Sequence, residues 1–398
     1  MKILAISTYY KPIKPGYGTR TPEIIIDSSA RLGHEVTVLT GIVPQDMISD
    51  SKFSKSEHIE KIGNGSVNIK RIWIPTSGHH KPLRRTLIYV TFVWSCFFKM
   101  LFSRDYDAVL GLFPFPPFLI PLELLAKLKR KKFYLHQGDL FPDTVIDFQI
   151  IKNPFLIKFL RKISMMSFNL ADLIGVNNLA TKKGMEKYVD EKNKLKYLEL
   201  AIDTEIFTTL NKNNNSRFSV LYNGVFGPAY DFDLILDAAK KLETYDIDFI
   251  IAGQGESESN IKIGIDKRKL TNVQVKSPVK EISNLIRRIN DSDVTILTLI
   301  QSDVSKTPHP SKVFEYMACG KPVICAGSGA IEDIFKRSEA GIIVPSGDLK
   351  KFVESILYLY HNRDILDKMG INARKYAVEN HSMEVYMKNF NKILESLS

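Results

Sequence analysis

The sequence has little cysteine, and its N-terminus lacks the features of a signal peptide. Cys96, Cys319 and Cys325 have no metal-ligand spacing and lie in apolar runs, which predicts buried, reduced thiols and argues against a disulfide framework. The opening MKILAISTYYKP has one lysine, a short apolar run and no small-residue cleavage site, so we interpret it as a buried first strand. GYGTRT lacks the third glycine of a dinucleotide-binding fingerprint, which argues against a nicotinamide enzyme.

Long uncharged apolar runs are also lacking. The most apolar segment, RRTLIYVTFVWSCFFKMLF at 84–102, is uncharged only over 86–98, and a bilayer span needs roughly 20 apolar residues. Arg84, Arg85, Lys99 and Arg104 bracket it. Two interpretations stay open: a buried helix of a first domain, or a helix lying in a membrane interface with its cations near lipid phosphates.

The chain is long, apolar and basic. It has 398 residues, 44% of them hydrophobic, with a formal net charge of +11. This length predicts two or three domains with large cores, and the charge favours anionic partners such as nucleotides or anionic lipid surfaces. We found no recognition module for nucleic acid and expect no nucleic-acid partner.

Strand and helix patterns alternate along the chain in two similar halves. KILAIST, HEVTVLTG, DAVLGL and KFYLHQ are strands of the first half, and the pattern restarts at FSVLYNG after the polar segment 211–217. Such alternation predicts parallel, doubly wound sheets, whose ligands lie beyond the carboxyl ends of the strands. We therefore expect a site in a cleft between two facing sheets.

Closely spaced aspartates occur in DYD, DFD, DID and DSD, and a metal-dependent transferase would need one such pair. Asp231 and Asp233 open a predicted helix, whereas Asp291 and Asp293 stand between a helix and a strand. Helix caps and turns account for these positions, so we expect no metal and no cofactor.

The segment HPSKVFEYMACGKPVI at 309–324 carries a carboxylate inside an apolar helix. Ser311, Lys312 and Glu315 share one face by their spacing, while Val313 and Phe314 predict burial of another. A helix N-terminus with a lysine binds anions, and a carboxylate can accept hydrogen bonds from a ribose diol. The pattern thus indicates a nucleotide diphosphate site. The alternative is a Lys312–Glu315 ion pair on a solvated face.

This sequence resembles the GT-B glycosyltransferases of glycosyltransferase family 4, in the branch that builds surface polysaccharides and lipid-linked glycans and includes fucosamine transferases. The resemblance rests on PGYGTRTPEIIIDSSARLGHEVTVLTG, ADLIGVNN, ELAIDTEIF, PSKVFEYMACGKPVI and GSGAIEDI. It implies two Rossmann-like α/β domains facing a central cleft: an acceptor domain at 1–205, a donor domain at 206–380, and a C-terminal helix at 381–398 that packs back toward the first domain. It also implies retention at the anomeric carbon without a metal.

The resemblance assigns roles residue by residue. Glu315 matches the glutamate that binds the donor ribose, and Ser311 and Lys312 match the start of the donor-binding helix. The remaining assignments are the loop glycines Gly16 and Gly18 with Arg20 near the donor phosphates, Gly224 and Gly227 in the donor-side loop, and Asp139 with Pro142 facing the acceptor. His136 could face the cleft or the sheet. The catalytic candidates are Lys312, Asp139 and His136.

Three departures from the family pattern concern the donor. Thr307 stands where a second glutamate is common, the loop NGVFGPAYDF lacks the usual arginine and lysine, and Gly138 replaces a histidine before Asp139. Lys312, helix amides or another cation such as Arg20 must then meet the diphosphate charge.

We expect a retaining, metal-independent hexosyltransferase. Its donor would be a nucleotide-diphosphate sugar, with UDP and an N-acetylhexosamine favoured by the resemblance, and its acceptor a glycan or lipid-linked glycan. We expect it in the cytoplasm, peripheral at the inner face of the cell membrane. The alternatives are a nucleotide-sugar epimerase on the same fold and a non-catalytic nucleotide-sugar-binding partner protein.

Overall fold

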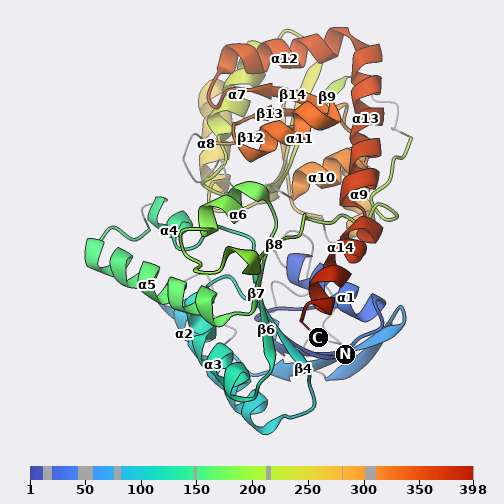
Figure 1. Cartoon of the computed structure of the whole chain (residues 1–398). Helices are drawn as coiled ribbons and strands as arrows, with labels where there is room; N and C mark the ends of the chain where they lie inside the picture. Colours follow the sequence, from blue (N-terminus) through green and yellow to red (C-terminus); the bar gives the residue numbers. More distant parts are fainter. Residues whose placement is uncertain are drawn as a thin grey trace. The chain divides into compact units, whose positions relative to one another are not determined.

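The protein forms two compact units (Figure 1). The computed structural model describes residues 1–11, 20–43, 57–75, 82–147, 150–211, 217–279, 281–300 and 311–397. The first unit contains Met1–Leu200 together with Tyr386–Ser398, and the second contains Ala201–Val385. The change of unit therefore falls at Leu200, before the polar segment 211–217, most of which lies outside the described residues.

The first unit is built on a sheet with the strand order β3-β4-β2-β1-β5-β6-β7-β8. Neighbouring strands are parallel except β3, which runs antiparallel to β4. The hairpin of β3 and β4 was not predicted, because its charged residues alternate with apolar ones over short stretches. The strands are β1 (Lys2–Ser7), β2 (Glu35–Gly41), β3 (His58–Ile62), β4 (Gly65–Ile72), β5 (Ala108–Leu112), β6 (Lys132–Gln137), β7 (Leu173–Val176) and β8 (Leu195–Tyr197).

Helices cover both faces of this sheet (Figure 1). α1 packs on β2 and β4, whereas α2, α3 and α5 pack beside one another. In the last helix, Phe390 lies against Tyr134 of β6, with ring centroids 6.1 Å apart. The helices are α1 (Arg20–Arg31), α2 (Pro82–Phe102), α3 (Ile120–Leu128), α4 (Asp143–Asp147), α5 (Pro154–Leu170), α6 (Leu179–Met185) and α14 (Met383–Glu395), with 3-10 turns at η3 (Pro116–Leu119) and η4 (Lys192–Lys194).

The second unit has a parallel sheet in the order β11-β10-β9-β12-β13-β14. Its strands are β9 (Phe218–Val225), β10 (Ile247–Gln254), β11 (Val273–Lys276), β12 (Val294–Thr298), β13 (Val323–Ala326) and β14 (Gly341–Val344). Its helices are α7 (Phe232–Lys241), α8 (Glu258–Arg268), α9 (Ile282–Asn290), α10 (Lys312–Ala318), α11 (Ala330–Ser338), α12 (Leu349–His361) and α13 (Arg363–His381).

Both units confirm the predicted doubly wound class. In each, the first strand in sequence lies inside the sheet: β1 lies between β2 and β5, and β9 lies between β10 and β12. The strand order reverses there, and the space beyond the carboxyl ends at such a reversal is where these folds bind ligands. Strands such as β5 and β12 are buried along their whole length, as expected for parallel strands covered on both faces.

Candidate functional sites in the two units

Gly224 and Lys312 meet at the carboxyl end of β9 in the second unit. Gly224 has a φ of +153°, a conformation that favours glycine, and a Cβ built on it would lie 2.5 Å from Lys312 Nζ. Gly253 of the neighbouring strand is equally constrained, because its Cβ would lie 1.8 Å from the Gly224 carbonyl oxygen. The lysine can approach the end of β9 only because Gly224 has no side chain.

Lys312 lies in an aromatic setting. Its Nζ donates a hydrogen bond to the Tyr222 hydroxyl at 2.8 Å and lies 4.3 Å and 3.9 Å from the ring centroids of Tyr222 and Tyr230. No described carboxylate lies within 4.0 Å of this ammonium. Burial lowers the pKa of Lys312 to about 7, although the charge of Glu315 acts to raise it. Such an ammonium is stabilised by an incoming anion.

Glu315 lies in the buried part of α10, and only 9% of it is exposed. This burial contradicts the alternative of a Lys312–Glu315 pair on a solvated face. The next residue, Tyr316, fixes the helix against β9: its hydroxyl accepts from the Asn223 amide and donates to the Asn223 carbonyl, each at 2.8 Å. α10 is therefore held against the strand that carries Gly224.

A second cation lies near the same strand end. Arg288 of α9 donates from Nη1 to the Asn223 side-chain oxygen at 3.3 Å and from Nη2 to the Ser277 carbonyl at 3.1 Å. Desolvation lowers the pKa of Arg288. The sequence analysis missed Tyr222 and Tyr230, which contact Lys312, and Arg288 and Tyr316, which contact Asn223, because nothing in their local spacing shows that they meet at the end of β9.

A separate cavity of about 240 Å³ lies in the first unit, beyond the carboxyl ends of β1, β5 and β6. Aromatic side chains from three segments line it: Tyr9 after β1, Tyr89 of α2, and Phe113 after β5. The lining among the described residues contains one carboxylate, Asp139, and no lysine or arginine. This cavity therefore suits an uncharged ligand with an apolar ring face.

Three buried polar atoms in this lining have no hydrogen-bond partner among the described residues: Thr8 Oγ1, His136 Nε2 and Gln137 Oε1. The side chains of His136 and Gln137 are each held in place by another polar atom. The Tyr134 hydroxyl lies 3.1 Å from His136 Nδ1, and Gln137 Nε2 donates to the Asp139 carbonyl at 2.6 Å. Unsatisfied buried polar atoms are costly, so a ligand that bonds to them would bind favourably.

Burial shifts the pKa values of both His136 and Asp139. Burial lowers the pKa of His136 to about 4, so the imidazole is neutral near pH 7. Desolvation raises the pKa of Asp139, whose carboxyl lines the cavity although the residue as a whole is exposed. The open question about His136 is answered: it lines the cavity while one ring nitrogen faces Tyr134 of the same strand.

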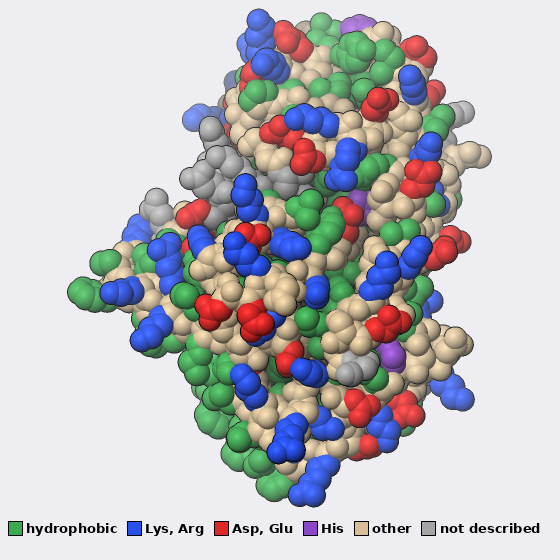
Figure 2. All heavy atoms as spheres, in the orientation of Figure 1, with side chains coloured by type: hydrophobic (Ala, Val, Ile, Leu, Met, Phe, Trp, Pro, Cys, Tyr) green, Lys and Arg blue, Asp and Glu red, His purple; other side chains and the backbone are tan. Residues whose placement is uncertain are grey.

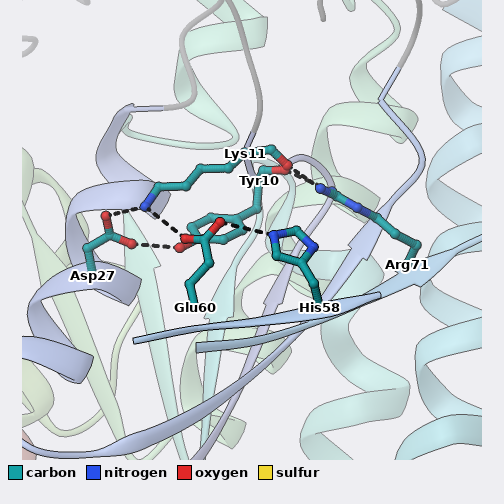
Figure 3. Close-up of polar contacts among 6 residues, drawn as sticks. All are labelled: Tyr10, Lys11, Asp27, His58, Glu60 and Arg71. Atoms are coloured by element: carbon teal, nitrogen blue, oxygen red, sulfur yellow. Dashed lines mark hydrogen bonds and ion pairs between the residues drawn. The ribbon is translucent and has the colours of Figure 1, made fainter. Parts of the chain in front are cut away.

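A polar network fixes the chain where it leaves β1 (Figure 3). Arg71 of β4 donates to the carbonyl of Tyr10 at 2.9 Å and to the carbonyl of Lys11. The Tyr10 hydroxyl and Lys11 Nζ donate to the two oxygens of Asp27, at 2.6 and 2.7 Å. Lys11 also lies 3.6 Å from Glu60, which contacts His58 at 3.0 Å. Arg71 keeps its charge at neutral pH, because burial lowers its pKa only to about 10.

The remaining predicted site residues fall in three groups. Gly16 and Gly18, like Thr307, lie outside the described residues, and Arg20 begins α1 with a side chain that is not described. Ser311 is exposed and immediately precedes α10, without a side-chain capping bond. Gly227 follows β9, and a Cβ there would meet only Val225 Cγ1, at 3.9 Å, so no close approach requires this glycine.

The aspartates considered for a metal have structural partners. Asp231 caps α7 by accepting from the Leu234 amide at 2.9 Å, and Asp293 accepts from the Ser219 amide at 2.7 Å and pairs with Arg363 at 3.2 Å. Within the described part of the chain, no group of three or more His, Cys, Asp or Glu side chains could hold a metal ion.

The apolar segment at 84–102 forms α2, and its two sides differ. Ile88, Phe92, Cys96 and Met100 are fully buried, whereas Leu87, Trp94 and Phe98 are about half exposed, at 55%, 49% and 54%. Arg84–Phe102 is long and apolar enough to cross a membrane by length and composition alone, and only 28% of its most apolar 18-residue stretch is buried. One side of α2 is therefore buried in the first unit, as the first interpretation expects, and the other side is exposed, so the membrane-interface interpretation stays a prediction.

The comparisons with known proteins agree with this architecture. Residues 203–376 match the model of the family described as glycosyl transferases group 1. The "Putative colanic acid biosynthesis glycosyl transferase WcaI" of Escherichia coli K12 is 24% identical over 98% of both chains. The O-antigen chain mannosyltransferase C of Escherichia coli is 23% identical, with 76% of this chain and 79% of that protein covered.

Solved structures show the same fold. HepE of Anabaena, crystallised in complex with UDP, has a TM-score of 0.72 with 15% identity over all of both chains. Sucrose-phosphate synthase of Thermosynechococcus elongatus has a TM-score of 0.77 with 13% identity, over 100% of this chain and 98% of that one. The protein therefore has the GT-B fold, and most of its second unit, residues 203–376, matches the group 1 glycosyl transferase model.

Proposed function

We propose that this protein is a retaining, metal-independent glycosyltransferase that moves a sugar from a nucleotide-diphosphate donor to a glycan or lipid-linked glycan. The observation that carries the proposal is the partly buried Lys312 beside Gly224, on the same helix as Glu315, in the region that matches the group 1 model. UDP is the proposed nucleotide, supported by HepE, which was solved with UDP and with UDP-glucose. An N-acetylhexosamine is the proposed sugar, on the resemblance alone.

In this proposal the second unit holds the donor. Lys312 binds the diphosphate, and Arg288 supplies the second positive charge that the loop after β9 lacks. Glu315 accepts hydrogen bonds from the ribose hydroxyls. A lysine with a pKa of about 7 in the free protein becomes fully charged when the diphosphate binds, because a neighbouring anion favours the protonated form.

The proposed chemistry is front-face transfer. The bond between the anomeric carbon and the β-phosphate oxygen breaks as the acceptor oxygen bonds to the same face of that carbon. The acceptor proton passes to the departing phosphate oxygen. The protein then contributes positioning and stabilisation of the charge on the leaving diphosphate.

The cavity of the first unit is the proposed binding place for the acceptor sugar. Its aromatic lining offers a surface for the apolar face of a sugar ring, and Thr8, His136 and Gln137 offer partners for its hydroxyls. Without lysine or arginine among the described lining residues, this cavity does not favour a phosphate. His136→Ala should raise the KM for the acceptor and leave the affinity for UDP unchanged.

The proposed branch is the one that builds surface polysaccharides and lipid-linked glycans, with the fucosamine transferases among its members. Supporting it are the two Escherichia coli relatives, whose names refer to colanic acid and O-antigen. A lipid-linked acceptor keeps its lipid in a bilayer, so the proposed location is the inner face of the cell membrane. The exposed apolar side of α2, with Arg84 and Arg85 at its start, supports this location.

A thermal-shift screen of UDP, GDP and their sugars tests the donor, since a ligand that binds only the folded state raises the melting temperature. The stabilising sugar nucleotide is then incubated with and without candidate acceptors. UDP release and a glycosylated product that both depend on the acceptor would support the transferase. Conversion of the sugar nucleotide to its epimer without an acceptor would support the epimerase instead, and binding without turnover would support the partner protein.

A further inference from the structure

Three adjacent helices of the first unit expose apolar side chains on their outer side. α3 contacts both α2 and α5, so the three form one layer. The exposed residues of α3 include Leu124 and Leu128, at 41% and 82%, and those of α5 include Phe155 and Phe159, at 84% and 58%. In Figure 2, hydrophobic side chains gather along this side of the first unit, with lysine and arginine beside them. The exposed apolar surface of α2 is thus part of a wider patch.

This layer has no exposed acidic side chain on its helices. α2 and α5 contain no aspartate or glutamate, and the single acid of α3, Glu123, is buried and accepts a 2.7 Å hydrogen bond from Ser167 of α5. Exposed cations lie among the apolar residues: Lys158 and Lys162 on α5, and Lys127 on α3. The charge of this surface is therefore positive next to its aromatic groups.

We propose that α2, α3 and α5 form one membrane-docking face for an anionic bilayer, with Phe155 and Phe159 as a second insertion point besides α2. Cations that reach lipid phosphates next to aromatic side chains that enter the interface are the pattern of interfacial binding. Two insertion points on separate helices fix the direction in which the first unit faces the bilayer, which a single helix cannot do. This inference extends the membrane location in the proposed function, but it is tested without catalysis.

The experiment measures binding of the full-length protein to vesicles by flotation. One set contains phosphatidylglycerol with phosphatidylcholine, and the other contains phosphatidylcholine alone. We expect binding to the anionic vesicles at low salt, with release as salt rises within the screening range. The affinity of the double variant Phe155→Ser with Phe159→Ser for anionic vesicles should be lower than that of the wild type by about tenfold or more, since two exposed aromatic groups no longer enter the interface. The double variant Lys158→Glu with Lys162→Glu should bind less at low salt only.

Two controls make the result specific. Ile371→Ser replaces an equally exposed apolar residue of the second unit, 69% exposed, and should bind as the wild type does. The sequence has two tryptophans, Trp73 and Trp94, so Trp73→Phe leaves only Trp94 of α2. Its fluorescence should shift to the blue when anionic vesicles are added.

Three outcomes would overturn the proposal. The first is no binding to anionic vesicles at low salt. The second is wild-type binding by the Phe155→Ser, Phe159→Ser variant, which would leave α2 as the only insertion point. The third is a dimer in sedimentation that this variant abolishes, which would assign the face to a second copy of the chain. If the wild-type protein binds the vesicles but shows no turnover with a water-soluble acceptor, that result would count against the proposed function and not against the docking face.

Discussion

Lys312 is the side chain on which the proposed chemistry depends. Its ammonium lies among tyrosines at the end of β9, with one hydrogen bond to Tyr222. Lys312→Ala should lower kcat roughly 100-fold or more, the scale for removing one electrostatic contact to a charge that develops in the transition state. Lys240→Ala, which removes an exposed lysine on α7, is the matched control. Turnover in Lys312→Ala equal to that of the control would contradict the assignment.

The lowered pKa of Lys312 predicts a pH dependence of UDP affinity. Because the free protein has a pKa of about 7 at this lysine, the ammonium is present below pH 7 and is lost as the pH rises above it. UDP binding above pH 7 must then recover one proton. The affinity should fall by about tenfold per pH unit above pH 7, until the pKa of the complex is reached. Calorimetry in buffers of different ionisation enthalpy would measure this uptake directly.

The same titration in Lys312→Arg provides the control, because arginine stays protonated throughout this range. Its UDP affinity should change little between pH 7 and 8.5. A wild-type affinity that is flat over this range, with no proton uptake, would mean that Lys312 does not titrate with the diphosphate.

Glu315 predicts selectivity for the ribose. If its carboxylate accepts from the ribose hydroxyls, Glu315→Ala should cost about 1.5–3 kcal/mol of UDP binding, the range for hydrogen bonds to a charged group. Wild-type protein should discriminate between UDP and 2′-deoxy-UDP, and the variant should not. Equal UDP affinity in variant and wild type, measured by calorimetry with the fold intact by circular dichroism, would reduce α10 to a packing element.

At the scale of elements, the junction of β9 and α10 has a steric requirement. Gly224→Ala places a methyl group 2.5 Å from the observed position of Lys312 Nζ, at a φ that side chains avoid. The variant should be destabilised by about 1–2 kcal/mol, and its UDP affinity should fall by roughly tenfold as the lysine is displaced. Gly227→Ala is the matched control, because its methyl group would meet only one atom, at 3.9 Å. Equal UDP affinity in the two variants would contradict this account.

The elements were largely predictable from the sequence, because parallel strands such as DAVLGL and amphipathic helices such as DFDLILDAAKKLE have distinct apolar periods. Glu315 and Lys312 were predictable because one helical face carries both. Tyr222, Tyr230 and Arg288 were not predictable, since they come from β9, the loop after it and α9. The Arg71 network around the exit of β1 escaped detection for the same reason: its members are far apart in sequence and meet only through the sheet order.

At the scale of the whole molecule, the reaction class predicts resistance to chelators. If Lys312 and Arg288 neutralise the leaving diphosphate, transfer should persist in EDTA at close to its rate without it. The measurement is acceptor-dependent UDP release from protein dialysed against EDTA. Loss of activity that Mn²⁺ restores would contradict the metal-independent mechanism. A transferase known to require Mn²⁺, assayed in parallel, shows that the chelation was effective.

The grouping of Tyr386–Ser398 with Met1–Leu200 has a consequence for synthesis. The first unit is discontinuous in sequence, and the second is inserted into it. A ribosome therefore releases the entire second unit before Phe390 can cover the Tyr134 ring. While the chain is growing, that side of β6 is an uncovered aromatic surface, and domains usually fold as they emerge. A protein shortened at its C-terminus would keep this surface permanently, and it should need chaperones more than the full chain does.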